Sequence, residues 1–276
     1  MTTVGLLHPG EMGSSVGACA RAGGADVLWA SENRSEATRQ RAAAEQLHDV
    51  GTLEALVDAS DIILSVCPPS SAPALAQAVA DRGFNGIFVD GNAVNPTTAA
   101  RIGETLRAVA ARFVDGGIIG PPARHAGSTR IYLSGPDATE VAALFEAGPL
   151  EARILESGSA SSLKMAFAAY TKGNAALALT VRALARAQGV EQALLEEWKT
   201  SLPQLAGFTE GAAKSTARKA WRFVGEMEEI AQTFADAGLA DGFHRAAGET
   251  YAAYADLKDA EDPNLDDVIE KMLRRK

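Results

Sequence analysis

The chain has 276 residues, 47% of them hydrophobic and 22% charged, which are ordinary proportions for a globular protein with room for two domains. Its 26 basic and 35 acidic side chains give a net charge of −9, which disfavours nucleic-acid and anionic-membrane partners. No apolar stretch reaches the ~18 residues that suggest a membrane-spanning helix, and no signal-peptide pattern is evident. Cys19, Cys67 and the four histidines show no metal-ligand spacing. We therefore expect a cytoplasmic protein without a metal site.

The first half of the sequence alternates short apolar runs with turns and helical segments. An apolar run at residues 4–7 precedes the turn His8-Pro9-Gly10-Glu11-Met12-Gly13, a helical segment and a second run at 27–30. This βαβ order directs the free N–H groups of a helix N-terminus at a pyrophosphate, so we expect residues 8–13 to bind a dinucleotide. Gly10 and Gly13 occupy the close-approach and helix-packing positions of the G-x-G-x-x-G pattern, whereas His8 stands at its first glycine.

The segment after the second run governs which dinucleotide is bound. Ser31, Arg34 and Ser35 are expected to hold a 2′-phosphate, and two further arginines follow within two helical turns. Glu32 is the competing residue, because a carboxylate there would bind the ribose 2′-hydroxyl and repel a phosphate. We expect NADP as the preferred cofactor and keep NAD as the alternative.

Two more apolar runs end in residues suited to a ligand-binding edge. The run at 62–66 ends in Cys67-Pro68-Pro69, and the run at 87–89 ends in Asp90-Gly91-Asn92. Because the carboxyl ends of parallel strands open on one edge of a sheet, we expect Cys67, Pro68 and Asn92 to face the nicotinamide. The alternative role for Asn92 is local capping before the next helix. Further strands near 113–114 and within 127–135 complete a first domain that ends at residue 156.

Helix-forming residues dominate from residue 157 to residue 276. We predict one long helix at 160–188, ended by Gly189, and then helices at 191–205, 210–237, 240–259 and 265–273, with Gly225 as an alternative break in the second of these four. The predicted fold class is therefore a Rossmann-type doubly wound α/β sheet followed by an all-helical domain, joined by a long interdomain helix. By structural analogy we expect a homodimer formed through the helical domain. We see no phosphate-binding basic cluster in this half.

Lys164 stands near the start of the long helix. The residues around it are mostly apolar, and the helix is expected to be apolar almost all round and buried. A buried ammonium is costly unless it is paired or used in function. The alternative is a solvated lysine on an exposed helix face. We interpret Lys164 as a functional group at the seam between the two domains.

Taken together, these motifs resemble the β-hydroxyacid dehydrogenase superfamily, which includes 6-phosphogluconate dehydrogenase and 3-hydroxyisobutyrate dehydrogenase. The family's G-x-G-x-M-G turn corresponds to residues 8–13 and its D-x-S-T-x-x-P segment to 90–96. Its substrate loop D-A-P-V-S-G-G corresponds to 115–121, and its helix motif G-x-G-x-x-x-K-x-x-N-N to 158–168. The resemblance covers the whole chain and is closest to a poorly characterised branch resembling 6-phosphogluconate dehydrogenase.

The resemblance implies an oxidoreductase that transfers a hydride between a nicotinamide and a small hydroxy acid or its oxo acid. Lys164 would be the general acid–base, and the expected substrate residues are Ile119, Gly120, Pro121, Ala168, Thr171 and Lys172. The family's substrate-loop serine is replaced by Ile119, and its paired asparagines are replaced by Phe167 and Ala168. A lost anchor could be replaced by Thr171 or Lys172, which lie two turns after Lys164 on nearly the same helix face. The alternative for Lys172 is a lysine that only extends from an apolar helix to solvent.

Two other functions remain open on the sequence alone. The loss of the serine and asparagines makes a less polar pocket, which suits an imine reductase, although a cationic Lys164 would repel an iminium substrate. The same losses permit an NADP-binding sensor or structural protein without catalysis. Turnover of NADP(H) with hydroxy acids, oxo acids and imines would distinguish these alternatives.

Overall fold

The computed structural model describes residues 1–274 and consists of two compact units, Met1–Lys164 and a second unit that begins at Met165. The boundary expected at residue 156 lies earlier than this one, because the first turn of the long helix belongs to the first unit. No helix within residues 1–274 is long and apolar enough to cross a membrane. The cytoplasmic location stays a prediction.

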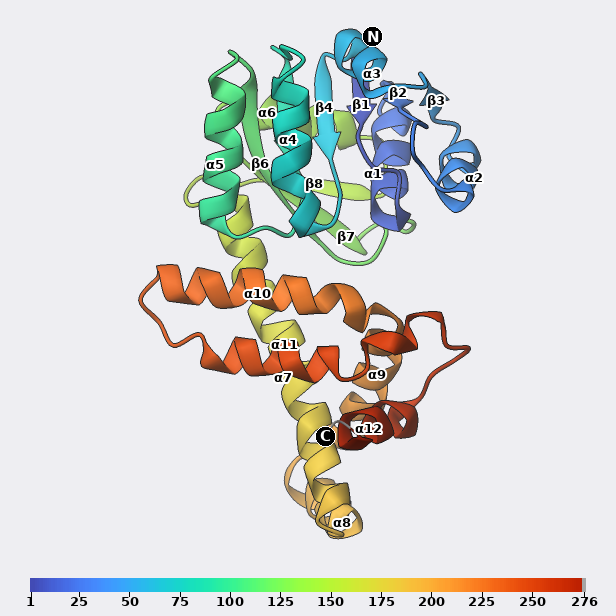
Figure 1. Cartoon of the computed structure of the whole chain (residues 1–276), viewed down its shortest axis with the longest axis vertical. Coiled ribbons are helices and arrows are strands. Elements are labelled where there is room, and N and C mark those ends of the chain that lie inside the picture. Colours follow the sequence, from blue (N-terminus) through green and yellow to red (C-terminus); the bar gives the residue numbers. More distant parts are fainter. Residues whose placement is uncertain (275–276) are drawn as a thin grey trace. The chain divides into compact units, whose positions relative to one another are not determined.

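The first unit is built on an eight-stranded sheet with the order β3-β2-β1-β4-β5-β6-β7-β8 (Figure 1). The strands are β1 (Thr3–Leu6), β2 (Asp26–Trp29), β3 (His48–Asp49), β4 (Ile62–Ser65), β5 (Ile87–Asp90), β6 (Arg112–Ile119), β7 (Thr129–Ser134) and β8 (Leu150–Ile154). The strands from β3 to β6 are parallel, β7 is antiparallel to β6, and β8 is parallel to β7. The doubly wound α/β fold is confirmed. The short β3 and the edge strand β8 were not predicted.

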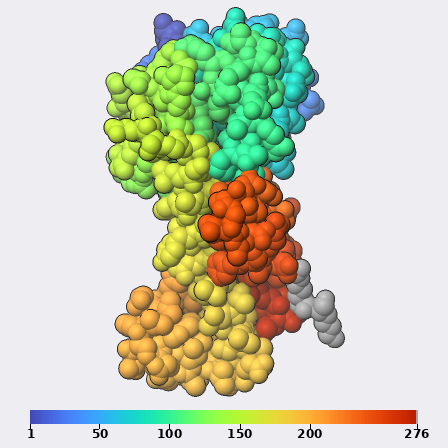
Figure 2. Space-filling model, turned by 90° about the vertical axis from the view of Figure 1, so that its left-hand side faces the viewer, coloured from blue at the N-terminus to red at the C-terminus, as the bar shows by residue number. Residues whose placement is uncertain are grey.

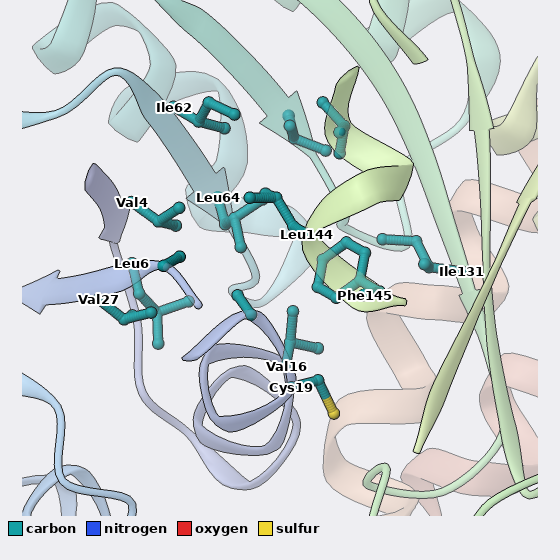
Figure 3. Close-up of a cluster of buried hydrophobic side chains, with 14 of the residues drawn as sticks. Val4, Leu6, Val16, Cys19, Val27, Ile62, Leu64, Ile131, Leu144 and Phe145 are labelled. Atoms are coloured by element: carbon teal, nitrogen blue, oxygen red, sulfur yellow. The ribbon is translucent and has the colours of Figure 1, made fainter. Parts of the chain in front are cut away.

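Helices cover both faces of this sheet. They are α1 (Glu11–Ala22), α2 (Glu36–Ala44), α3 (Leu53–Ala59), α4 (Ala72–Ala80), α5 (Pro96–Arg107) and α6 (Ala138–Ala142), with single 3₁₀ turns η1 (Pro69–Ser71) and η2 (Ala143–Phe145). Successive strand residues point to opposite faces, so Ile62 and Leu64 join the core beneath α1, whereas Ile63 joins the core beneath α3, α4 and α5. Figure 3 shows the first of these cores, with Val16 and Cys19 of α1 among the strand side chains. Burial on both faces explains why the strands are continuous apolar runs.

The second unit is all-helical. Its helices are α7 (Ala160–Ala187, whose first turn lies in the first unit), α8 (Glu191–Ser201), α9 (Leu205–Thr216), α10 (Ala220–Asp236), α11 (Gly242–Ala252) and α12 (Leu265–Arg274), with 3₁₀ turns η3 (Ala217–Lys219) and η4 (Ala255–Asp259). The long helix is confirmed, but the single helix predicted at 210–237 is wrong. The break comes at η3, where Ala217 and Ala220 are fully buried and only small side chains fit, whereas Gly225 lies inside α10.

The C-terminal half of α7 is tied to its neighbours by a polar network. Arg182 is buried and donates to the Glu191 carboxylate (2.8 Å) and to the Thr209 hydroxyl (2.8 Å). Arg186 pairs with Glu191 (2.7 Å) and with Asp266 of α12 (2.7 Å). Two guanidinium groups therefore share one carboxylate, which satisfies the charge of the buried Arg182 and connects α7 to α8, α9 and α12.

The expectation that α7 is apolar all round and buried is wrong. Phe167, Tyr170, Leu177 and Leu184 are 46%, 73%, 49% and 60% exposed, and Figure 2 shows atoms of this helix (yellow) at the molecular surface. They are spaced by three, seven and seven residues, as a and d positions of a heptad are, which places them on one side of the helix. Within residues 1–274, α7 therefore has an apolar stripe that no other part of the chain covers fully.

Candidate functional site

The sheet order places the predicted dinucleotide site at a topological switch point. The chain passes from β1 to β2 and β3 in one direction and from β4 to β5 and β6 in the other, so β1 and β4 are the central neighbours. The turn at residues 8–13 follows β1, and Cys67 and Pro68 follow β4. In open parallel sheets the crevice at such a point, outside the carboxyl ends of the strands, is where ligands bind.

The N-terminus of α1 has the features of an anion site. Gly10 is the N-cap of this helix and supplies no side-chain cap, so the first-turn N–H groups are left for another acceptor. By contrast, Ser35, Thr52 and Asn95 cap α2, α3 and α5 with their side chains. A Cβ atom at Gly13 would lie 2.0 Å from the carbonyl oxygen of His8, so only glycine permits this close packing of turn and helix.

His8, at the first glycine position of the motif, contacts Arg34 of the β2–α2 loop. The Arg34 guanidinium lies 2.8 Å from His8 Nδ1 and donates to the carbonyl oxygen of Leu7 (3.0 Å). Burial, and then the charges of Arg34 and Arg41, lower the pKa of His8. His8 is therefore neutral at pH 7, and its Nδ1 accepts the hydrogen bond from Arg34. The histidine therefore links the turn at residues 8–13 to the β2–α2 loop.

Arg34 of the β2–α2 loop is joined by Arg39 and Arg41 of α2, and these arginines are held by hydrogen bonds. Arg39 donates to the carbonyl of Ser31 (3.0 Å), and Arg41 donates to the carbonyl of Pro9 (3.3 Å). Arg34 Nε is buried and has no hydrogen-bond partner in residues 1–274. The carboxylate of Glu32 is exposed and makes no hydrogen bond or ion pair with the described residues. The arrangement fits an anionic group near Arg34 better than a neutral one.

Asn92 braces the ends of two strands. Its Oδ1 accepts from the backbone N–H of Cys67 (2.5 Å), and its Nδ2 donates to the Ser65 hydroxyl (2.9 Å) and to the Asp90 carboxylate. The side chain is buried, so both ends of its amide are used in holding β4 beside β5. This differs from the alternative of helix capping, because Asn95 is the residue that caps α5.

Cys67 and Pro68 follow β4 at the same edge. Burial, together with the nearby charge of Asp90, raises the pKa of the Cys67 thiol to about 12. A thiol in this state is not a nucleophile at neutral pH. Pro68 is exposed. Within residues 1–274, no group of three or more His, Cys, Asp or Glu side chains is arranged to hold a metal ion.

Lys164 lies against the last part of β6. Its ammonium donates to the carbonyl oxygen of Ile118 at 2.6 Å, and its side chain is half-buried. The last residue pair between β5 and β6 is Asp90 with Asp115, so β6 continues past the end of β5 before it reaches Ile118. Lys164 is therefore fixed at the strand-end edge that also carries Cys67 and Asn92.

Asp115 fixes the helix turn that carries Lys164. Its carboxylate accepts from the Ser161 backbone N–H (2.9 Å), from the Ser161 hydroxyl (3.0 Å) and from the Ser134 hydroxyl (3.3 Å). The Ser134 hydroxyl in turn accepts from the backbone N–H of Ala160 (3.0 Å). Burial raises the pKa of Asp115, although these hydrogen bonds oppose the shift. Asp115 thus acts as the N-terminal cap of α7, supplied from the neighbouring strand rather than from the helix itself.

Sequence reasoning did not identify Asp115 as a site residue. The signal available was its position as the first residue of the substrate-loop motif. A second signal, at Gly117, is visible only in three dimensions: a Cβ atom there would lie 2.6 Å from the Ala160 carbonyl oxygen and 3.2 Å from Lys164 Cβ. Gly117 therefore allows α7 to approach β6 closely enough for the Asp115 contacts.

The predicted substrate residues fall into two groups. In the first unit, Ile119 is a buried residue of β6, whereas Gly120 and Pro121 are exposed. Gly120 has φ of +128°, and a Cβ atom there would lie 2.4 Å from the Ser128 carbonyl oxygen, so the backbone requires glycine.

The other three predicted substrate residues lie in the second unit. Ala168 is buried, and the exposed Thr171 donates its hydroxyl to the carbonyl of Phe167 (3.1 Å). Lys172 pairs with the carboxylate of Glu226 at 2.8 Å, and the two side chains are 14% and 13% exposed. The alternative of a lysine that extends to solvent therefore does not describe Lys172, which is mostly buried and ion-paired.

Replacing Asp115 tests its role as the cap of α7. Asp115→Ala leaves the buried Ser161 N–H without its acceptor, which we expect to lower the free energy of unfolding by about 1–3 kcal/mol. Asp115→Asn keeps a carbonyl oxygen and should lose less. Ser162→Ala, at an exposed position in the same turn, is the matched control and should change stability by less than about 0.5 kcal/mol. Urea unfolding followed by circular dichroism measures all three, and an Asp115→Ala protein as stable as the parent would contradict the assignment.

Comparison with known proteins identifies two family matches along the chain. Residues 3–147 match the family described as the NAD binding domain of 6-phosphogluconate dehydrogenase. Residues 185–254 match a domain of unknown function, DUF1932. The first match spans the dinucleotide turn, the β2–α2 loop, Asn92 and Asp115, and the second lies wholly in the helical unit.

The chain is also similar to individual proteins. It is 33% identical over 172 residues to an uncharacterized 28.5 kDa protein in the 7S RNA 5′ region of Methanothermus fervidus, and this alignment covers 62% of the chain and 66% of that protein. Among solved structures, a conserved hypothetical protein from Sinorhizobium meliloti 1021 is 27% identical with a TM-score of 0.68, covering 100% of this chain and 97% of that one. Mycobacterium tuberculosis 3-hydroxyisobutyrate dehydrogenase is 17% identical with a TM-score of 0.71, covering 99% of both chains.

The same fold occurs in proteins of other activities. A Streptomyces aurantiacus imine reductase has a TM-score of 0.54 at 19% identity, covering 98% of this chain and 99% of that one. Psf3 in complex with NADP⁺ has a TM-score of 0.66 at 19% identity, with the same coverage. Likeness at this level of identity concerns the fold alone. The match over residues 3–147, which contain β1 to β7, does more: the chain belongs to the family of the 6-phosphogluconate dehydrogenase NAD-binding domain, and with it to a poorly characterised branch of the β-hydroxyacid dehydrogenase superfamily.

Proposed function

We propose that this protein is an oxidoreductase that prefers NADP and transfers a hydride between the nicotinamide and a small hydroxy acid or its oxo acid. The observation that carries the proposal is the position of Lys164, whose ammonium donates to the Ile118 carbonyl at 2.6 Å beside the strand-end edge. An ammonium group carries three N–H donors, so beside this carbonyl it is of the right chemical type to contact a substrate oxygen. It is therefore suited to move a proton at that oxygen.

In the proposed reaction the bound cofactor supplies the hydride acceptor or donor. During oxidation, Lys164 in its neutral form would take the proton of the substrate hydroxyl as the carbon–hydrogen bond is broken. During reduction, the ammonium would return that proton to the carbonyl oxygen. The Ile118 carbonyl keeps the amine in place in both directions, and Asp115 holds the helix turn from which Lys164 extends.

The preference for NADP rests on the charge of the β2–α2 loop. Arg34 precedes α2, and Arg39 and Arg41 lie within it. The buried Nε of Arg34 has no hydrogen-bond partner in the described chain. A 2′-phosphate would supply the missing acceptor and a charge opposite to that of the guanidinium. Ser31 and Ser35 lie in the same loop, and Ser35 already caps α2.

The substrate anchor we propose is Lys172 or Thr171, in place of the family's asparagines. Lys172 is held by Glu226, so a carboxylate substrate would have to share or displace that partner. Thr171 is exposed, and its hydroxyl is bonded to the helix backbone. Ile119 and Ala168 contribute apolar surface rather than hydrogen bonds, which favours a substrate with fewer polar groups than 6-phosphogluconate.

The retained lysine favours a carbonyl or hydroxyl substrate over an imine. An iminium ion and the ammonium of Lys164 carry the same charge and repel each other. The discriminating experiment measures NADPH oxidation with matched oxo acids and cyclic imines. Faster turnover of imines, or binding of the cofactor without any turnover, would favour an imine reductase or a sensor instead.

Substitutions of Lys164 test the chemistry. Lys164→Ala should lower kcat by about 10²–10⁴-fold, the usual contribution of a general acid–base, with little change in cofactor affinity. Lys164→Arg should fail almost as completely, because a guanidinium does not release its proton near neutral pH. Steady-state kinetics and a cofactor titration measure the two effects separately. An active Lys164→Ala enzyme would transfer the proposed role to another residue, such as Lys172.

Substitution of Arg34 tests cofactor choice. Arg34→Ala should weaken NADP(H) binding by about tenfold to a hundredfold, as expected for a lost charge-assisted hydrogen bond, and leave NAD(H) binding nearly unchanged. Arg34 also contacts His8 of the turn at residues 8–13, and loss of that contact would weaken both cofactors alike. NAD(H) binding is therefore the control for NADP(H) binding. Equal losses for both would mean that Arg34 acts through that turn. A parent protein that prefers NAD(H) would make Glu32 the deciding residue.

We also propose that two copies associate through α7. The exposed stripe of Phe167, Tyr170, Leu177 and Leu184 follows the spacing of helix-pairing residues, and isolated apolar side chains would not show such regularity. A second copy is the partner that presents the same stripe in a self-complementary way.

A charge within the stripe should separate the two copies. Leu177→Glu should convert a dimer to a monomer in light scattering coupled to size-exclusion chromatography, because it places a carboxylate in an apolar contact. Leu239 lies outside the stripe and is 59% exposed, against 49% for Leu177, so Leu239→Glu should leave the dimer intact. A parent protein that is monomeric at tens of micromolar would exclude the proposal.

A further inference from the structure

The helical unit contains a cavity of about 400 Å³, and two of its lining residues, Thr171 and Lys172, are the substrate anchors proposed above. It is lined by residues of α7, α9, α10, α11 and the turn η3. Its lining includes three aromatic residues, Phe208, Phe223 and Tyr251, and two lysines, Lys172 and Lys219. This is within the size range of pockets for small organic molecules.

The charged residues that line the cavity are both basic. No carboxylate is among its lining residues in the described chain. Lys172 is neutralised by Glu226 at 2.8 Å, whereas Lys219 makes no hydrogen bond or ion pair within residues 1–274. The surrounding segment 214–222 carries Lys214, Arg218, Lys219 and Arg222 without an acidic residue, in a chain of net charge −9. The sequence analysis expected no phosphate-binding cluster in the helical half; this segment is nevertheless locally basic.

Phe223 connects the charges to the apolar surface. The ammonium of Lys172 lies 5.0 Å from the centre of the Phe223 ring, and the guanidinium of Arg222 lies 5.6 Å from it. Both contacts are in the range of cation–π interactions, which hold the cations beside the ring. An apolar wall and positive charge therefore meet at one place in the cavity.

The other polar groups of the lining are already satisfied. The Tyr251 hydroxyl donates to the carbonyl of Lys172 (2.8 Å), and the Thr216 hydroxyl pairs with that of Tyr254 (3.1 Å). The Ser215 hydroxyl donates to the carbonyl of Ala212 (3.2 Å). The lysine ammonium groups are thus the donors that remain for a ligand. Few donors beside a largely aromatic wall match a carboxylate on an apolar body better than a phosphate, which needs more donors for its three oxygens.

We propose that this cavity is a binding site for a small monocarboxylic acid with an apolar or aromatic body, with Lys219 binding the carboxylate and Phe208 and Phe223 contacting the body. Lys219 is the main cation for the ligand because the charge of Lys172 is shared with Glu226. All lining residues belong to the helical unit, so binding of the acid does not require the role proposed for Lys164, although the site shares Thr171 and Lys172 with the proposed substrate anchor.

Isothermal titration of the full chain without cofactor tests the site. The probes are 3-phenylpropionate, its neutral amide and inorganic phosphate. We expect the acid to bind at least tenfold more tightly than the amide or phosphate. Lys219→Gln should weaken binding of the acid by about tenfold or more, as expected for a lost charge-assisted hydrogen bond. Lys214→Gln is the matched control, because Lys214 lies on the same segment but does not line the cavity, and it should leave the affinity unchanged. Phe208→Ala should also weaken binding of the acid.

Several outcomes would overturn the proposal. Equal binding of acid and amide would mean that charge does not select the ligand, and equal effects of the two lysine substitutions would mean a diffuse surface attraction. Absence of binding, including in a dimer whose second copy covers the cavity, would exclude the site. Lys164→Ala should bind the acid as the parent does, and a loss there would place the acid at the redox site. A protein that binds the acid normally but turns over no substrate would contradict only the proposed oxidoreductase function. Unchanged thermal melting of each variant shows that it is folded.

Discussion

The capping of α7 by Asp115 is the interaction on which the candidate site depends. A helix of 28 residues begins at Ala160, and its first N–H groups would be unsatisfied without an acceptor from outside the helix. Asp115 provides that acceptor from β6, in a buried position where its negative charge also faces the positive end of the helix dipole. Asp115 contacts Ser161, and Lys164 follows Ser161 by three residues in the same helix. The position of Lys164 is therefore set by this contact.

Comparison with the family's substrate-loop motif shows which parts of the loop carry the backbone geometry. Of its seven positions, Asp115 and Gly120 are identical to the motif, and both have a geometric role: Asp115 caps α7, and Gly120 has a φ that other residues rarely adopt. Ile119 and Pro121 differ from the motif; Ile119 is a buried residue of β6, and Pro121 is exposed. At the first turn, Gly13 is likewise required by close packing, whereas His8, which differs from the motif, contacts Arg34. The motif residues retained at these positions are therefore those with a role in the backbone geometry.

The sequence predicted the fold better than the pairings within it. Strands buried on both faces are continuous apolar runs, so the order of strands and helices follows from local pattern, as does the long helix up to Gly189. The contacts of Arg34 with His8 and of Lys172 with Glu226 join residues far apart in the sequence, and no periodicity marks them. The exposed side of α7 was missed for a related reason: an apolar side chain has the same appearance in the sequence whether its partner is a neighbouring helix, another chain or solvent. The site residues predicted from the motifs stay predictions at this stage.

The acidic chain has one basic region in the sheet unit and one in the helical unit. One lies in the sheet unit, where Arg34 of the β2–α2 loop and Arg39 and Arg41 of α2 donate to backbone carbonyls. The other lies in the helical unit along 214–222, beside the cavity. Because the overall charge is −9, each region is a local exception that attracts anions against the general field of the protein. Guanidinium groups with several fixed donors suit a phosphate, whereas a single flexible ammonium suits a carboxylate. Under the two proposals above, the arginines near α2 would bind the 2′-phosphate of a cofactor, and Lys219 would bind the carboxylate of a small acid.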